Sequence, residues 1–87
     1  MRQEPDFFRD SDNLVLIYIA KKLKESLRLE EVLTAAGLDY LVEPDTYSGG
    51  MIFKSERTGA FFYVAPEDEA TSRELLVRES YRPYELT

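Results

Sequence analysis

The spacing of apolar residues changes period along the chain. Residues 14–20 form a continuous apolar run rich in β-branched side chains, which is typical of a strand covered on both faces or central in a sheet. Helical spacing follows from about residue 24 to residue 36. The stripe expected to face the core consists of Leu29, Val32, Leu33 and Ala36. Leu23 and Leu27 lie off this stripe, so either the helix begins later or it covers additional surface.

The end of this helix is marked by Gly37, which favours a left-handed C-cap, and by Leu38, the apolar residue that usually closes such a cap. A short strand is predicted at residues 40–43, stopped or bent by Pro44. Residues 45–50 have the composition of a loop. Residues 51–54 and 60–64 are expected to pair as a hairpin around residues 55–59.

The second helix has the stronger start signal. Pro66 suits the first helical position, and the three acids at residues 67–69 complement the positive end of the helix dipole. We expect this helix to continue to about Ser80, followed at residues 82–86 by an edge strand or an extended tail. The residues expected to be buried on it are Ala70, Leu76 and Val77.

The order of elements is strand, helix, strand, strand, helix, with a final strand left open. This order predicts an α+β domain of ferredoxin-like type, β-α-β-β-α(-β), with two helices packed on one face of an antiparallel sheet. A chain of 87 residues has room for one core, so residues 13–87 are assigned to a single domain. Residues 1–12 are assigned to an irregular N-terminal arm.

The amino-acid composition restricts the possible reactions and ligands mainly through two residue types that the chain lacks. The chain has no cysteine and no histidine, so it lacks the side chains most used as metal ligands, thiolate nucleophiles and neutral-pH acid–base groups. We therefore expect no metal site, no cofactor and no enzymatic activity. The net charge of −6 argues against nucleic acid as a partner. No apolar run approaches the ~20 residues of a membrane span and no secretory signal is evident, which predicts a cytoplasmic protein without a membrane partner.

Positive charge gathers locally at Lys21, Lys22 and Lys24. A solvated connection between strand and helix explains this cluster most simply. The alternative is an anion site, in which a helix N-terminus and these lysines act together with Arg57.

Two junctions carry a resemblance to a known family. They are residues 31–38, which end in Ala-Ala-Gly-Leu, and residues 62–68, Phe-Tyr-Val-Ala-Pro-Glu-Asp, which lead into residues 73–76. They resemble a family of small bacterial domains of unknown function, labelled prokaryotic signal-transducing proteins and compared in fold with the PII nitrogen regulators. The likeness covers about residues 14–77 and differs in that residues 61–63 are aromatic and the chain has no tryptophan. It implies a ferredoxin-like fold and no particular activity.

Aromatic residues make up 13% of the chain, more than so small a domain is expected to bury fully. Our hypothesis is a small non-catalytic interaction or regulatory domain that forms a homo-oligomer or binds another protein. The residues expected at its interface are Phe7, Phe8, Tyr47, Phe61 and Tyr84. The alternative, suggested by the PII comparison, is a module that senses a small anion or nucleotide through Lys21, Lys22, Lys24 and Arg57.

An enzyme would have to rely on carboxylates. Glu43 and Asp45 would lie on the same face of a strand, next to a glycine-containing loop. Acids before a turn are common for reasons of turn formation and solubility, so we do not expect this pair to be catalytic.

Overall fold

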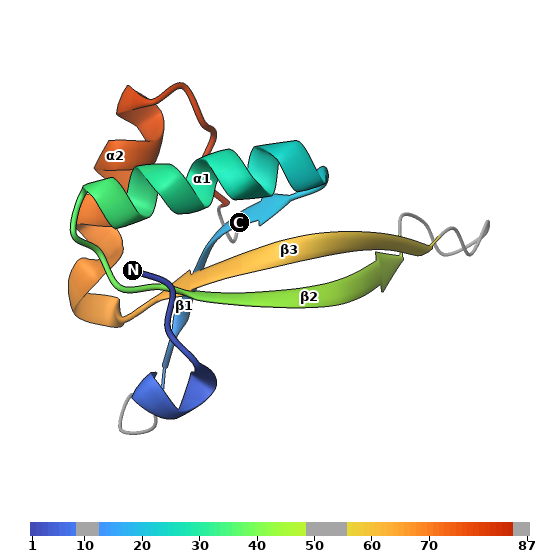
Figure 1. The fold of residues 1–87 in the computed structure, drawn as a ribbon, viewed down its shortest axis with the longest axis horizontal. Helices are drawn as coiled ribbons and strands as arrows, with labels where there is room; N and C mark the ends of the chain where they lie inside the picture. Colours follow the sequence, from blue (N-terminus) through green and yellow to red (C-terminus); the bar gives the residue numbers. More distant parts are fainter. Residues whose placement is uncertain (9–12, 49–55, 85–87) are drawn as a thin grey trace.

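The structure is a computed structural model that describes residues 1–8, 13–48 and 56–84. Within them it contains a three-stranded antiparallel sheet and two α-helices (Figure 1), which confirms the predicted α+β class. The elements in chain order are η1 (Pro5–Phe8), β1 (Val15–Ala20), α1 (Leu23–Ala35), β2 (Leu41–Ser48), β3 (Glu56–Val64), η2 (Pro66–Asp68) and α2 (Glu69–Arg78).

The sheet has the order β1-β3-β2, with β3 in the centre. β3 pairs antiparallel with both neighbours, so β1 and β2 run in the same direction. The pairing of β1 shifts between Leu16 and Tyr18, which leaves Ile17 as an extra residue. Because of this bulge, Ile17 and Tyr18 both face the helices although they are consecutive. The bulge explains why the apolar run of β1 does not alternate.

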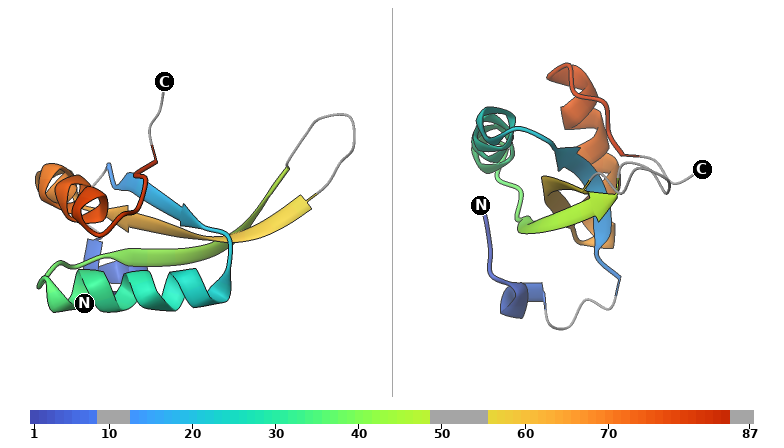
Figure 2. Two further views of the ribbon diagram at one scale, coloured as in Figure 1. Left: turned by 90° about the horizontal axis from the view of Figure 1, so that it is seen from above. Right: turned by 90° about the vertical axis from the view of Figure 1, so that its right-hand side faces the viewer.

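Both helices lie on one side of the sheet, where they enclose the main core (Figures 1 and 2). Phe62 of β3 is fully buried there and stacks on Tyr40 with ring centroids 6.0 Å apart. Leu29 and Leu33 of α1 and Leu76 of α2 close the core from above and are also fully buried. Burial of these side chains is the main term that holds helices and sheet together.

A smaller core lies on the opposite side of the sheet. There η1 places Phe8 against Leu41 and Ala65, with Leu14 and Tyr63 at its margin. Phe8 is buried although it belongs to the segment expected to be irregular. Within residues 1–8 the chain instead forms one turn of 3-10 helix and a short parallel bridge between Arg2 and Tyr40.

The end of α1 confirms the predicted cap. Gly37 has φ +77°, its N–H donates to the Thr34 carbonyl oxygen, and the N–H of Leu38 donates to that of Leu33. This pair of bonds is a Schellman motif, and Leu38 closes it as a buried residue. The end of α2 repeats the pattern with Ser80 at φ 69°, where no glycine marked it.

The hairpin prediction is wrong in its pairing. β2 runs through Pro44 to Ser48 and pairs with β3 from Leu41↔Tyr63 to Ser48↔Glu56, so residues 45–48, expected to be loop, are strand. Glu56 to Gly59, expected to be the connection, also belong to a strand. Residues 51–54, expected to be a strand, lie outside the described residues. Pro44 is accommodated because β2 is an edge strand, where a residue without N–H is tolerated.

The buried face of α2 also differs from the prediction. Leu76 is buried as expected, whereas Ala70 and Val77 are exposed. Ser72 faces the core instead, and its hydroxyl donates to the Asp68 carbonyl oxygen at 2.7 Å. That bond satisfies a buried hydroxyl within the helix, so a polar residue occupies a position that its type did not reveal.

Candidate functional site

The described residues cover only part of the sheet face that lies opposite the helices. The smaller core occupies one end of it, where η1 packs. Beyond that end lie three half-buried apolar side chains, Leu16, Ile19 and Phe61. The strand register places Ile19 directly opposite Phe61, and Leu16 opposite Tyr63, on this face. We call Leu16, Ile19 and Phe61 the open patch.

The open patch carries little charge. Among the strand residues whose side chains are described, Glu43 is the only charged one on this face, opposite Phe61. An apolar sheet face of this kind is a typical surface for contact with another protein layer.

The outer edge of β1 is partly occupied by the segment after α2. The N–H of Tyr84 donates to the Ile17 carbonyl oxygen at 2.7 Å, and the Tyr84 carbonyl oxygen accepts from Arg73 Nη1 at 2.6 Å. Tyr81 adds an edge-to-face ring contact with Tyr18 at 5.4 Å. We call residues 81–84 the C-terminal strap. Residues 82–84 are not a strand, and residues 85–87 lie outside the described residues.

The outer edge of β2 begins under the first residues of the chain. Gln3 N–H donates to the Tyr40 carbonyl oxygen at 2.8 Å, and Tyr40 N–H donates to that of Met1 at 3.2 Å. Further along the same edge lies Pro44, which has no N–H to offer to another strand. Both edges of the sheet therefore carry features that oppose pairing with a further chain.

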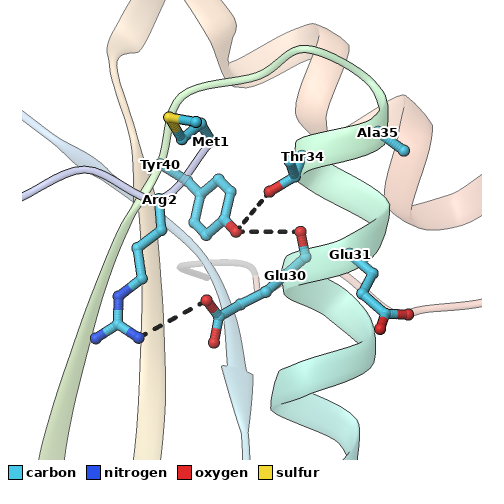
Figure 3. A pocket seen from close by; sticks show the side chains of 7 residues that line it. All are labelled: Met1, Arg2, Glu30, Glu31, Thr34, Ala35 and Tyr40. Atoms are coloured by element: carbon cyan, nitrogen blue, oxygen red, sulfur yellow. Dashed lines mark hydrogen bonds and ion pairs between the residues drawn. The ribbon is translucent and has the colours of Figure 1, made fainter.

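A shallow hollow lies between the first residues of the chain and α1 (Figure 3). Its volume is about 500 Å³. Figure 3 shows a guanidinium and a carboxylate, those of Arg2 and Glu30, facing each other across it at 3.7 Å. The residues that line it are Met1, Arg2, Glu30, Glu31, Thr34, Ala35 and Tyr40.

The polar groups of this hollow are engaged with one another. The Tyr40 hydroxyl donates its hydrogen to the Glu30 carbonyl oxygen at 3.1 Å. Because that hydrogen is already used, the Thr34 hydroxyl, 2.9 Å away, donates to the Tyr40 hydroxyl oxygen. Burial raises the pKa of Tyr40, and the bond from Thr34 partly offsets that effect. The hydroxyl chain ties α1 to the start of β2. We therefore assign these groups to holding the helix on the sheet.

The three predicted lysines gather at the start of α1, where Lys21, Lys22 and Lys24 are all exposed. The side chain of the fourth predicted cation, Arg57, lies outside the described residues. The backbone of Arg57 pairs with that of Tyr47 on β2. Arg57 lies three residues along β3 from Ala60, which pairs with Ala20 at the end of β1. Lys22 is the N-cap residue of α1 and makes no capping bond with its side chain.

The predicted interface residues fall in different places. Phe7 is exposed, and Phe8 is buried under the sheet, with the two rings 5.0 Å apart. Phe61 belongs to the open patch, and Tyr84 to the C-terminal strap. The Tyr47 side chain lies outside the described residues. The structure thus brings Phe7, Phe8 and Phe61 to the same face of the sheet and sets Tyr84 at its edge.

The carboxylate pair considered for catalysis is only half described. Glu43 is exposed, and the Asp45 side chain lies outside the described residues. Their backbone positions pair with Phe61 and Gly59, on one face of the sheet. Among the residues that the structure describes, no three histidine, aspartate, glutamate or cysteine side chains meet as a metal site.

Sequence reasoning passed over two features. Leu23 and Leu27, which lay off the helical stripe, are 76% and 53% exposed and stand among the lysines. Their spacing of four residues was the available signal. Arg73, which holds the strap through the Tyr84 carbonyl oxygen and pairs with Glu69 at 2.9 Å, gave no signal because its main partner is a backbone atom.

Comparison of the chain with protein-family models, with curated proteins and with solved structures found no match. No helix within the described part of the chain is both long enough and apolar enough to cross a membrane.

Proposed function

We propose that this chain is a small non-catalytic interaction domain that self-associates through the open patch. The observation that carries the proposal is the contrast between the two faces of one sheet. Helices bury Phe62 and Ile17 on one face, while Leu16 and Ile19 of β1 stay half-buried on the other. Half-buried apolar side chains in neighbouring strands are stabilised when a second layer covers them.

The edges of the sheet support a contact between faces rather than between strands. Association by strand pairing needs a free row of N–H and carbonyl groups. The strap occupies the β1 edge at Ile17, and Pro44 interrupts the β2 edge. A partner would therefore pack on the open patch more readily than it would pair with an edge strand.

The low charge of the described open patch allows a second copy of the same chain to be the partner. Each copy carries a net charge of −6, so two copies repel wherever their acidic surfaces meet. The open patch has one carboxylate, Glu43, among its described strand neighbours. A two-fold arrangement places this patch against itself and keeps the remaining charges apart.

The proposal includes the ferredoxin-like arrangement and the likeness to the bacterial signal-transducing domains. In its support, β3 lies between the two parallel strands β1 and β2, and the crossover between them contains α1. The strap lies along the β1 edge, where a fourth strand of that arrangement would pair. A regulatory role follows from this likeness and rests on it.

Sedimentation equilibrium over a wide concentration range tests the proposal. We expect the wild-type chain to form a dimer, and the substitution Ile19→Lys to weaken it by about tenfold or more, because a charge would then face the partner's apolar patch. Val77→Lys is the matched control, since Val77 is an exposed apolar residue on the other side of the molecule. Its dimer should be as strong as that of the wild type. A wild-type chain that stays monomeric at about millimolar concentration would refute self-association.

A further inference from the structure

The start of α1 combines exposed leucines with a concentration of positive charge. Leu23 and Leu27 are separated by one helical turn and are among the most exposed large apolar side chains of the described residues. Four exposed cations surround them. We call this surface the basic-leucine patch; its members are Lys21, Lys22, Leu23, Lys24, Leu27 and Arg28.

The one acid within this segment is turned inward. The Glu25 carboxylate accepts the backbone N–H of Lys21 at 3.3 Å. It also adds to the effect of burial, which raises the pKa of Tyr18 to about 12. The exposed side chains of the segment are therefore all cationic or apolar.

We propose that the basic-leucine patch docks onto an anionic lipid surface. Exposed leucines that insert among headgroups, with cations around them that attract anionic lipid, are the two components of peripheral membrane binding. Lysine and arginine also have long apolar stems, which let their charged ends reach headgroups while the leucines go deeper. We expected no membrane partner because no segment could span a bilayer, but docking at its surface needs no such segment.

The composition of the patch favours lipid over a protein partner. Lysine is depleted at protein–protein interfaces, and leucine is under-represented among the residues that dominate their binding energy. Three of the four cations here are lysines, which act as point charges without a preferred direction. The patch also lies outside two hollows lined by described residues, one at Arg2 and Glu30 and the other at Arg73 and Val77.

The acidic character of the whole chain does not prevent this contact. The acids of η2 and of the first residue of α2, Glu67 to Glu69, lie near the end of the molecule where α1 finishes (Figures 1 and 2). α1 has 13 residues and is therefore about 20 Å long. At physiological ionic strength charges are screened over about 8 Å, so the acids at the far end of α1 have little effect on a surface at its start.

Co-sedimentation with lipid vesicles tests the proposal. We expect the wild-type chain to bind vesicles that contain about 30% phosphatidylserine in phosphatidylcholine, and to bind pure phosphatidylcholine much more weakly. Binding should fall when salt is raised from about 0.15 M to about 0.5 M. The double variant Leu23→Ser, Leu27→Ser should lower the partition coefficient by about tenfold or more. Replacing Lys21, Lys22 and Lys24 by glutamine should lower it by about fivefold for each cation.

The matched control is Val77→Ser with Arg78→Gln, which removes an exposed apolar residue and an exposed cation from α2. It should bind vesicles as the wild type does, and circular dichroism should show the same helix content in all variants. Equal binding to neutral vesicles, or an unchanged partition coefficient in the leucine variant, would overturn the proposal. Polyglutamate is the probe for the other class of partner. Binding to it without binding to anionic vesicles would assign the patch to an acidic protein and would also overturn the proposal.

This inference does not depend on self-association. The variant Ile19→Lys lies outside the basic-leucine patch and should still bind anionic vesicles as a monomer. A dimer would carry two patches and would bind more tightly through their combined effect. A wild-type chain that stays monomeric but binds anionic vesicles would refute the proposed function alone. A wild-type chain that dimerises but does not bind anionic vesicles would refute this inference alone.

Discussion

Phe61 and Phe62 are neighbours on the central strand, and they have opposite surroundings. Phe62 is fully buried between the sheet and the two helices, stacked on Tyr40. Phe61 points to the other face, where it is half-buried beside Ile19. The two faces of the sheet thus differ in burial: the helices cover one face, and half-buried apolar side chains lie on the other, where we propose the contact between copies.

The largest effect should come from breaking the covered face. Phe62→Ala removes a fully buried ring from the main core, and we expect it to lower the free energy of unfolding by about 3–5 kcal/mol. Phe61→Ala is the paired variant on the open face and should cost about 1 kcal/mol. Urea denaturation at a concentration where the chain is monomeric measures both. Equal losses would show that the two faces do not differ in the way we describe.

A smaller effect should follow from cutting the link between α1 and β2 on the covered face. Tyr40→Phe removes the hydroxyl that accepts from Thr34 and donates to the Glu30 carbonyl oxygen. We expect a loss of about 1 kcal/mol in unfolding free energy. Thr34→Val is the control, because Thr34 is exposed and the bond from Tyr40 to Glu30 remains; it should change stability by less than about 0.5 kcal/mol. If Thr34→Val lowered the unfolding free energy as much as Tyr40→Phe does, the bond from Tyr40 to Glu30 would not have the stabilising role assigned to it.

Alkaline pH probes the margin of the covered face at Tyr18. Burial, with the Glu25 carboxylate nearby, raises the pKa of Tyr18 from 10.0 to about 12. The folded state therefore holds this proton more tightly than the unfolded state, so its contribution to stability is complete below pH 10.0 and is lost as the pH rises towards about 12. Ultraviolet titration should show one tyrosine with a midpoint near pH 12 that is missing in Tyr18→Phe. A variant whose titration curve equals that of the wild type would contradict this assignment.

The last pair of variants, with effects of about 1 kcal/mol or less, concerns the ends of the two helices that cover the core. Ser80 has φ 69° in the position that Gly37 occupies at the end of α1. Ser80→Gly should raise the melting temperature slightly, by a gain of about 0.5 kcal/mol, because glycine adopts this conformation without strain. Gly37→Ala should act in the opposite sense and cost about 1 kcal/mol, although nothing lies within 4 Å of the added carbon. If Ser80→Gly and Gly37→Ala both raised stability, or both lowered it, the two helices would not share this cap geometry.

The sequence predicted the elements that local chemistry determines. Residues 14–20 and the helix ending at Gly37 appear close to their expected bounds, because apolar period and a glycine cap are local signals. The pairing of β2 was not predictable in the same way. Pro44 suggested a stop, but an edge strand tolerates it, and edge or centre is a property of the whole sheet.

The candidate surfaces were predictable only in part. Phe61 was named from its aromatic character, whereas its partner in the open patch, Ile19, depended on a bulge at Ile17 that the sequence did not indicate. The lysines at the start of α1 were noted as charges, but exposure of Leu23 and Leu27 depends on how α1 is turned against the sheet. Tertiary packing decides both, and no single element contains that information.

Methyl NMR on dilution tests the difference between the two faces most directly. Ile17 and Ile19 lie two residues apart on β1, the first fully buried under the helices and the second on the open patch. We expect the methyl signals of Ile19 and Leu16 to shift as the chain is diluted, while those of Ile17 and Leu33 stay constant. Shifts confined to Ile17 and Leu33, or no concentration dependence in any methyl signal, would contradict the account.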